Sequence, residues 1–366
     1  ERRELLKDAD VVVLSVAIGG PAYHGPVFEA EMGIPNQYGI VQTVGDTMGP
    51  GMTFRALRTA PPMLDRMRDI NELAPNAVIL NYTNPMAILT WALDEAAEGP
   101  LVGLCHGVTG NARHFANIAG VPFEEVNFTC AGINHMTWFT RYEHCHRDLL
   151  PAIHAALRER YPHSDPYQFR GELLEAFGYY CTESDRHFPE YVPWFQNGDR
   201  ALFEPHVART MDIKNKRANM YEDMGVALEE AERDSLKLTP SHESASGIME
   251  AMVTNEPYTF SGNVMNQGLI GNLPQGCCVE LPCTADKNGI HGHTQDDLPI
   301  QCAALCRSNI IVQELTVEAI RRRSKELAFQ ALLMDPVTQA NVTIQQAKAM
   351  FEELWAAESE LLVEYD

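Results

Sequence analysis

Three short polar clusters follow apolar runs in the first half of the chain. The clusters are Asn81 with Asn84, Cys105 with His106, and Asn134 with His135. A thiolate and an imidazole from neighbouring segments can form an open site for Mn²⁺, Zn²⁺, Fe²⁺ or Co²⁺, which leaves positions for substrate oxygens. For Cys105 taken alone, the alternative is a small buried residue that serves only the core.

The elements that must position these clusters are predicted strands. Largely apolar runs at 11–20, 76–85, 100–110 and 125–136 are typical of buried parallel strands, and helical stretches lie between them. Alternating strands and helices predict an α/β fold with a Rossmann-like, doubly wound sheet. Ligands of such sheets bind outside the carboxyl ends of the strands, so we expect the three clusters to share one cavity.

The second half of the chain has a different pattern of predicted secondary structure. Long helical segments are predicted at 168–178, 207–234, 243–254, 298–332 and 343–363, with a stretch rich in glycine, proline and cysteine at 261–289. We therefore expect an α/β domain over 1–140, followed by a mostly helical α+β domain over 141–366 that contributes to substrate binding, catalysis and oligomerisation.

Composition narrows the class of partner. The 366 residues carry a formal charge of −22, which argues against nucleic acids and anionic membranes and favours small molecules. The nine cysteines are odd in number and include the adjacent pair Cys277 and Cys278, which predicts reduced thiols in a cytoplasmic protein. No apolar run reaches the roughly 20 residues that span a bilayer.

Seven motifs, in order along the chain, carry a resemblance to a known family. They are DADVVVLSVAIGG, VQTVGDTMGPGMTFRALRTAP, LNYTNPMA, GLCHG, CAGINHM, EYVPWF and GNVMNQGLIGNLPQGCCVELPC. Together they resemble glycoside hydrolase family 4, whose members depend on NAD and a divalent metal and do not use the two-carboxylate mechanism. The resemblance implies that residues 1–140 form a dinucleotide-binding domain and that Mn²⁺ is the metal.

The family's mechanism implies an oxidation that is later reversed. Hydride leaves C3 of the sugar to NAD⁺, a base removes the acidified C2 proton, and a metal holds the C2 and C3 oxygens. The aglycone leaves by elimination, water adds, and the hydride returns. The substrate is therefore a small-molecule α-glycoside, and NAD is regenerated in each turnover.

The resemblance also assigns site residues. It implies that Cys105 and His135 bind the metal, and that His106 protonates or positions the leaving oxygen, with orientation of the metal site as the alternative. Asn84 and Asn134 are expected to bind sugar hydroxyls, although Asn134 could instead bond to a strand end. For the C2 base the best match is Tyr191, with Tyr179 and Tyr180 as alternatives; a packed core residue is the competing interpretation of Tyr191.

The cofactor surface is only partly present in this sequence. Ala17 and Gly19 follow the first strand and, with Asn81, are the candidates for NAD contact; a turn cap is the competing interpretation of Asn81. The family's glycine-rich phosphate loop would precede residue 1. We expect that segment in the intact protein; the alternative is a protein that cannot bind NAD in the family manner.

Substrate class follows from the same resemblance. Histidine after the metal cysteine is typical of members that act on unphosphorylated α-hexosides, and the segment NLPQGCCVELPC is most similar to the α-galactosidase branch. His242 occupies a position at which several relatives carry arginine. A histidine there argues against a phosphorylated or strongly anionic sugar as the substrate. α-Glucosidase, α-glucuronidase and α-galacturonidase remain alternatives, and Arg55 and Arg58 are candidate partners for a carboxylate.

Two rival functions and the assembly also remain open. A lactate- or malate-type dehydrogenase shares the dinucleotide fold without a metal, and an inactive sugar-binding protein would have lost the chemistry. A dehydrogenase would accumulate NADH with product, whereas the cyclic glycosidase would not. Relatives suggest a homodimer or homotetramer.

Overall fold

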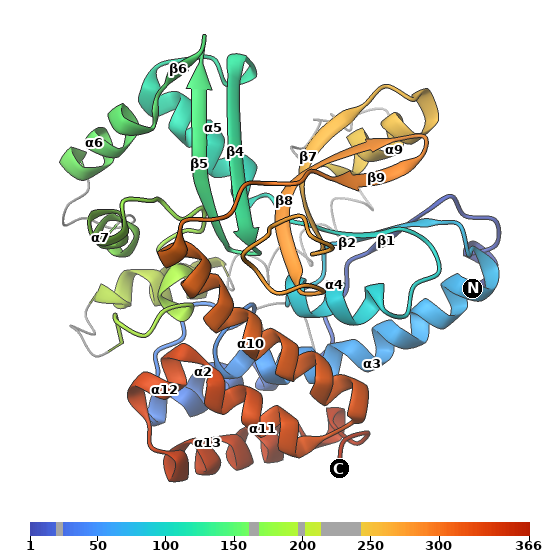
Figure 1. Cartoon of the computed structure of the whole chain (residues 1–366). Helices are drawn as coiled ribbons and strands as arrows, with labels where there is room; N and C mark the ends of the chain where they lie inside the picture. The colour runs from blue at the N-terminus through green and yellow to red at the C-terminus, as the bar shows by residue number, and fades with distance from the viewer. Residues whose placement is uncertain (20–24, 161–167, 197–201, 214–242) are drawn as a thin grey trace, which may run out of the picture.

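The computed structural model describes residues 1–19, 25–160, 168–196, 202–213 and 243–366. Their strands form one sheet in the order β1-β2-β3-β7-β8-β4-β5-β6, with β9 paired to β8 (Figure 1). Helices α3, α10, α11 and α13 lie together below this sheet in that view, and the carboxyl terminus lies beside them.

The parallel part of the sheet confirms the predicted α/β fold class. Strands β1 (Val11–Leu14), β2 (Val78–Asn81) and β3 (Leu101–Leu104) pair in parallel. Helix α3 (Pro50–Leu73) connects β1 to β2, and α4 (Met86–Asp94) connects β2 to β3. Every residue of β2 and β3 is buried, which is why the two strands are apolar at every position except Asn81 at the end of β2.

The rest of the sheet is antiparallel, so the prediction of a parallel strand at 125–136 is wrong. Part of this antiparallel region comes from an unexpected segment. Its strands are β4 (Val126–Ile133), β5 (Met136–His144), β6 (Arg147–Asp148), β7 (Tyr258–Met265), β8 (Cys278–Asp286) and β9 (Gly289–Gly292). Strands β7 and β8 arise from the 261–289 region and lie between β3 and β4. The sheet therefore crosses residue 140, and the division into 1–140 and 141–366 stays a prediction.

The carboxyl ends of β3 and β4 meet, although the two strands run in opposite directions. One row of paired residues crosses the sheet through Gly103, Asn263, Glu280 and Gly132. Strand β3 reaches this row from one side and β4 from the other, and β4 pairs with β8 at Gly132 alone. The clusters after β3 and β4 are thus neighbours because the two strands overlap only at their ends.

The second half of the chain is largely helical, as predicted. Its described helices are α6 (Leu150–Arg160), α7 (Gln168–Phe177), α9 (Ala245–Thr254), α10 (Ile300–Arg322), α11 (Lys325–Met334), α12 (Pro336–Asn341) and α13 (Ile344–Ala357). Of the predicted helix at 207–234, residues up to 213 are described and helical, and the remainder lies outside the described residues.

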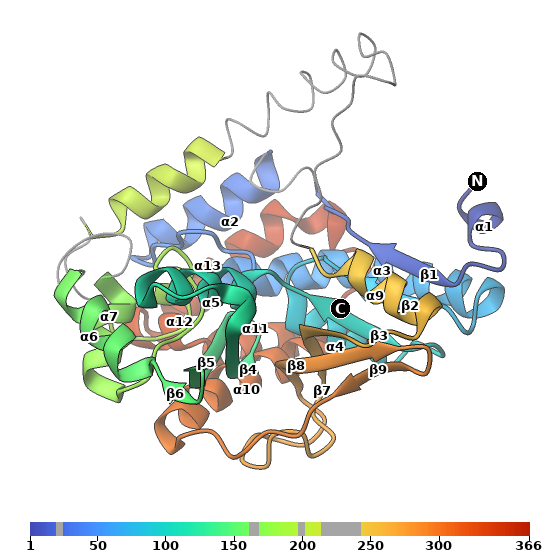
Figure 2. The same ribbon diagram turned by 90° about the horizontal axis from the view of Figure 1, so that it is seen from above.

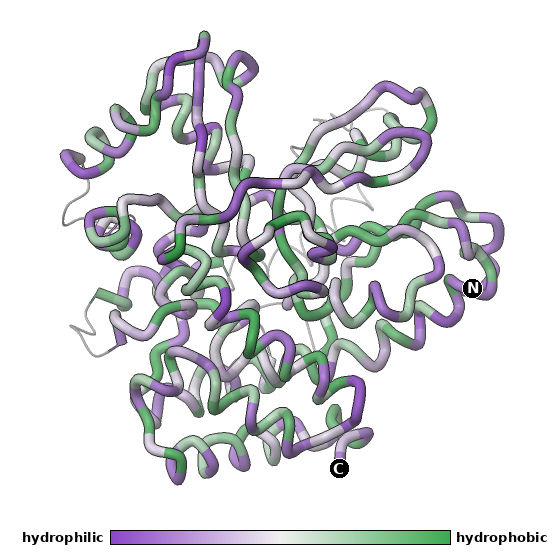
Figure 3. The backbone as a smooth tube through the Cα atoms, in the orientation of Figure 1, coloured by the Kyte–Doolittle hydropathy of each residue, from purple (hydrophilic) through white to green (hydrophobic). Residues whose placement is uncertain are grey.

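Three further helices belong to the first half: α1 (Arg2–Leu5), α2 (Pro26–Gln37) and α5 (Gly107–Ala119). Seen from above, α5 lies beside β4 and β5 (Figure 2). In the tube coloured by hydropathy, the parallel strands and α4 are mostly hydrophobic (Figure 3). In the described part of the chain, no helix is both long and apolar enough to cross a membrane.

Asp335 joins α12 to the beginning of α3. Its buried carboxylate caps α12 by accepting hydrogen bonds from the Thr338 amide at 2.7 Å and hydroxyl at 2.8 Å, and it lies close to the Gly49 amide. We expect Asp335→Ala to lower the free energy of unfolding by about 2 kcal/mol, because a cap is lost and buried donors lose their acceptor. The measurement is the urea midpoint.

Thr343→Ala is the matched control for Asp335→Ala, because it removes the exposed capping box of α13. Its expected cost is about 0.5 to 1 kcal/mol. An equal or smaller loss for Asp335→Ala would show that its carboxylate does not join the two helices.

Candidate active site

A cavity of about 1000 Å³ opens where the three parallel strands end. Its walls come from the residues after β1, β2 and β3, the β4–β5 turn, helix α3 and the segment 183–187. Of the residues singled out from the sequence, the walls include Ala17, Gly19, Asn84, Cys105, His106 and His135. The structure therefore brings the predicted clusters together on one cavity.

Cys105 lies at the end of β3 and is partly buried. Its thiol contacts the side chain of Asn134 and the main-chain amide of Gly107. Burial, with the nearby carboxylates of Glu280 and Glu183, raises the pKa of this thiol well above its usual value. A site that disfavours added negative charge in this way favours a bound cation.

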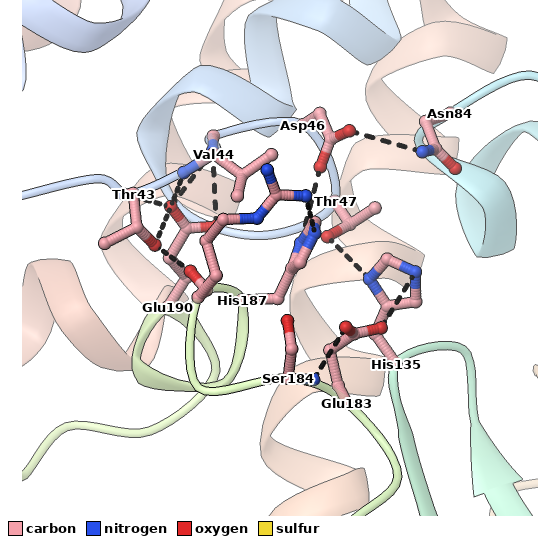
Figure 4. A network of polar contacts seen from close by, with 12 residues as sticks. Thr43, Val44, Asp46, Thr47, Asn84, His135, Glu183, Ser184, His187 and Glu190 are labelled. Carbon is pink, nitrogen blue, oxygen red and sulfur yellow. Dashed lines mark hydrogen bonds and ion pairs between the residues drawn. The ribbon is translucent and has the colours of Figure 1, made fainter. Parts of the chain in front are cut away.

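His135 is held from several sides in a conformation uncommon for histidine. Its backbone φ is +63°, and its amide lies close to the buried Glu280 carboxylate. The ring Nδ1 lies 3.2 Å from the Thr47 hydroxyl, and Nε2 lies 3.3 Å from Glu183 Oε2 (Figure 4). A left-handed residue fixed by surrounding contacts on a cavity wall points to a functional role.

Three buried side chains that were not singled out from the sequence complete this wall. Asp46 accepts a hydrogen bond from Asn84 Nδ2 at 3.3 Å and lies 3.8 Å from His187 Nδ1 (Figure 4). The His187 ring packs edge-on against His135, with 4.8 Å between the ring centroids. Although burial opposes ionisation of Glu183, the charges of His135 and His187 lower its pKa to about 2. The sequence signal was the run at 183–187, in which two acidic residues, an arginine and a histidine lie within five positions.

The donor chemistry of this corner fits a divalent transition metal. A Cβ built on Gly107 would lie 3.5 Å from Glu183 Oε2 and 3.7 Å from the Cys105 sulfur, so both groups border one small space. Among the described residues, no group of three or more His, Cys, Asp or Glu side chains is arranged to hold an ion. Metal binding by Cys105 and His135 therefore stays a prediction, and it requires further ligands besides these two side chains.

The predicted sugar-binding residues lie at different depths relative to the cavity. Asn84 lies on the wall beside Asp46, and His106 stands at the rim, where its side chain is 80% exposed and its Nδ1 is 3.8 Å from Glu243 Oε1. Asn134 is buried and donates to Glu280 at 3.3 Å, which makes it a link between Glu280 and the Cys105 thiol. Its contact with a sugar stays a prediction.

Tyr191 lies behind His135. The two ring centroids are 6.3 Å apart, and the Tyr191 hydroxyl lies close to Thr47, whose own hydroxyl contacts His135. Tyr191 is fully buried and does not line the cavity, and burial raises its pKa well above 10. A role as the C2 base stays a prediction that requires the cavity wall to shift around substrate.

The alternative tyrosines are no better placed. Tyr180 is fully buried beneath the Arg170 guanidinium, and Tyr179 is partly buried; neither lines the cavity. Tyr82, which was not singled out from the sequence, is the tyrosine found on this wall within the described residues. Its hydroxyl accepts from the Ala245 amide at 3.3 Å, and burial raises its pKa to about 12.

The main chain after β1 offers a surface for a cofactor. Gly19 has φ +92°, and a Cβ there would lie 3.0 Å from Arg58 Nε, so glycine permits a close approach. The Arg58 guanidinium donates hydrogen bonds to Ile18 O and to the carboxylates of Glu31 and Glu358. Because these groups already occupy it, Arg58 is unsuited to bind an anionic sugar. Contact of Ala17 and Gly19 with NAD stays a prediction, supported by their place on the cavity wall.

Asn81 makes no contact with the cavity through its side chain. It is fully buried, accepts from the Thr83 amide at 2.9 Å and donates to the Thr83 carbonyl. The turn-forming interpretation is the one that these bonds favour, so any contact with NAD would come from its main chain.

Two further arginines line the cavity. In the part of the chain that the structure describes, Arg55 Nε and Arg186 Nη1 are buried without a hydrogen-bond partner. His242, the other position weighed for anionic sugars, lies outside the described residues.

Comparison with known proteins identifies the family. The model of the family 4 glycosyl hydrolases matches residues 1–121, and the model of their C-terminal domain matches residues 130–338. An α-galactosidase of Bacillus subtilis (strain 168) is 36% identical over all of this chain and 84% of its own length. An α-galactosidase of Rhizobium meliloti (strain 1021) is 34% identical over all of this chain and 76% of its own length.

Solved structures agree in fold. A Bacillus subtilis structure named as a glucosidase superposes with a TM-score of 0.85 at 27% identity, covering 96% of this chain and 84% of that one. A 6-phospho-α-glucosidase from gut microorganisms, solved with NAD and Mn²⁺, superposes with a TM-score of 0.82 at 22% identity over 99% and 83% of the two chains. These matches favour neither of the two rival functions, the dehydrogenase and the inactive sugar-binding protein. The chain belongs to family 4 of the glycoside hydrolases and is a glycosidase.

Proposed function

We propose that this glycosidase releases α-linked galactose from unphosphorylated α-galactosides, with NAD⁺ and Mn²⁺ as cofactors. The observation that carries the proposal is that Cys105 and His135 line one cavity with the glycine-containing end of β1. The α-galactosidases of Bacillus subtilis and Rhizobium meliloti, each matched over all of this chain, support the choice of sugar.

The chemistry divides between cofactors and side chains. When bound, NAD⁺ supplies a hydride acceptor and Mn²⁺ a Lewis acid for sugar oxygens. Cys105 and His135 would hold the metal, and residues 17–19 would face the nicotinamide end of NAD⁺. The Asp46 carboxylate, oriented by Asn84, can accept a hydrogen bond from a sugar hydroxyl.

His106 suits the leaving group because it stands at the rim. Its exposed ring, with Glu243 at 3.8 Å, can deliver a proton to the departing oxygen and exchange it with water. The nine free cysteines favour a reducing compartment such as the cytoplasm, which a thiolate ligand needs. A homodimer or homotetramer remains part of the proposal.

A substrate panel tests the proposed function. The nitrophenyl α-galactoside, α-glucoside, α-glucuronide and α-galacturonide are assayed with NAD⁺, Mn²⁺ and a thiol reductant. We expect the highest kcat/KM for the galactoside, dependence on both cofactors, and no net NADH. Preference for another sugar would refute the galactoside assignment, and NADH formed in proportion to product would refute the cyclic mechanism.

α-Galacturonidase is the second candidate. Arg55 and Arg186 bring buried nitrogen donors without partners to the cavity wall, where they could bind a sugar carboxylate. An α-galacturonidase of Bacillus subtilis (strain 168) is 29% identical over 96% of this chain. A galacturonide preference that Arg186→Gln abolishes would select this alternative.

Tyr191→Phe tests the base. We expect exchange of the C2 proton with solvent deuterium to fall about a hundredfold or more, because general-base catalysis contributes at least that factor. The measurement is deuterium incorporation by mass spectrometry. Tyr142→Phe is the control, since it also removes a buried hydroxyl, one that donates to Ala112 O. Undiminished exchange in Tyr191→Phe would place the base elsewhere, and Tyr82 would be tested next.

A further inference from the structure

A second hollow, of about 550 Å³, lies beside the active-site cavity. It is bordered by α5 and β4 on one side and by α9 and β7 on the other. Figure 1 shows why it exists: the arm formed by β4 and β5 diverges from the arm formed by β7, β8 and β9. Since β4 pairs with β8 at Gly132 alone, the strands separate immediately beyond the active site.

The walls of this hollow combine aromatic rings with hydrogen-bonding groups. Tyr258 and Phe260 stack with an interplanar angle of 15°, and the Arg113 guanidinium lies 4.3 Å from the Phe123 ring centroid. The polar residues on the walls include Thr109, Asn127, Ser246 and Glu250. A sugar ring has apolar C–H faces and a rim of hydroxyls, so it is the kind of ligand that this mixture suits.

The two hollows share a boundary at the proposed leaving-group residue. Glu243 lines both of them, and its carboxylate lies 3.8 Å from the His106 ring. The first turns of α5 are divided in the same way, with Gly107 and Gly110 on the active-site cavity and Thr109 on the second hollow. A substrate that extends past His106 would therefore enter the second hollow.

We propose that the second hollow binds the leaving group of the substrate, and that this group is a second hexose. The inference rests on the proposed function and extends it, because it makes an α-linked oligosaccharide the substrate. The galactosyl ring occupies the active-site cavity, the bond to be cleaved passes His106, and the second ring lies against Tyr258.

A steric block tests this assignment. Ser246 is exposed on α9 and lines the second hollow, so Ser246→Trp fills that space without disturbing the core. Met249→Trp is the matched control, because Met249 is 37% exposed on the same helix and lines neither hollow. Both variants are assayed on α-galactosyl fluoride, which has no second ring, and on galactose linked α-1,6 to glucose.

We expect Ser246→Trp to lower kcat/KM about tenfold or more for the disaccharide and less than about twofold for the fluoride, with Met249→Trp unchanged on both. Equal losses on the two substrates, or no loss on the disaccharide, would overturn the inference. A changed oligomeric mass with an unchanged substrate ratio would assign the hollow to a second copy of the chain instead. If the unmodified protein did not hydrolyse the fluoride, the proposed function itself would fail.

Discussion

Cys105→Ser is expected to lower kcat/KM at least about a thousandfold and to abolish tight Mn²⁺ binding. A Lewis acid contributes several kcal/mol to stabilising an enediolate, and a serine hydroxyl does not replace a thiolate as ligand. The thiol lies on the cavity wall in contact with Asn134, so an isosteric change should leave the fold intact. The measurements are steady-state kinetics and Mn²⁺ titration followed by electron paramagnetic resonance.

Cys145→Ser is the control for Cys105→Ser. Cys145 is exposed in the turn between β5 and β6, away from the cavity. Its activity and Mn²⁺ affinity should equal those of the unmodified protein. If Cys105→Ser kept full activity with the same metal affinity, the assignment of Cys105 as a metal ligand would be wrong.

Arg170→Met is expected to lower the free energy of unfolding by about 3 to 5 kcal/mol. Arg170 Nε donates to Asp185 Oδ1 at 2.9 Å, and both side chains are almost completely buried. Asp185 also accepts from the amides of Phe169 and Arg170. Removing the guanidinium strands a carboxylate in the interior, which costs far more than the pair contributes. Denaturant unfolding measures the loss.

Arg170→Met should also disturb the active site. Arg170 Nη1 donates to Asn111 at 2.9 Å, and Asn111 in turn donates to the carbonyl oxygens of Gly107 and Thr182. These bonds fix the turn after Cys105 and the residue before Glu183. We therefore expect Mn²⁺ affinity to fall together with stability.

Arg158→Met is the matched control for Arg170→Met. Arg158 pairs with Glu175 at 2.6 Å, but both side chains are exposed, so the expected cost is about 0 to 1 kcal/mol. The double variant Arg170→Met with Asp185→Asn should recover part of the loss. A cost for Arg170→Met no greater than that of Arg158→Met would show that the buried pair does not hold this region.

The sequence was sufficient for the parallel strands and for the meeting of the polar clusters. Within the run at 76–85, residues 77–80 are all apolar because both faces of β2 are covered, and that pattern is local. The pairing of β7 and β8 between β3 and β4 was not predictable in the same way. Their residues lie in a stretch rich in glycine and proline, and their strand conformation depends on neighbours far along the chain.

The sequence also did not predict which side chains from distant segments would meet at the site. Asp46 and Glu183 belong to segments about 140 residues apart, and only the fold shows that both face His135. Asn81, in contrast, was correctly considered as a turn former, because asparagine commonly bonds to the backbone two residues on. Local chemistry was predictable, whereas the membership of a site assembled from several segments was not.

The most direct test of whether Cys105 and His135 bind one metal ion is a titration with Co²⁺ in place of Mn²⁺, followed by absorbance in the near-ultraviolet. The account predicts a sulfur-to-cobalt charge-transfer band in the unmodified protein, its loss in Cys105→Ser, and at least about tenfold weaker binding in His135→Gln. A band of unchanged intensity in Cys105→Ser, or cobalt affinity unaffected by both substitutions, would contradict it.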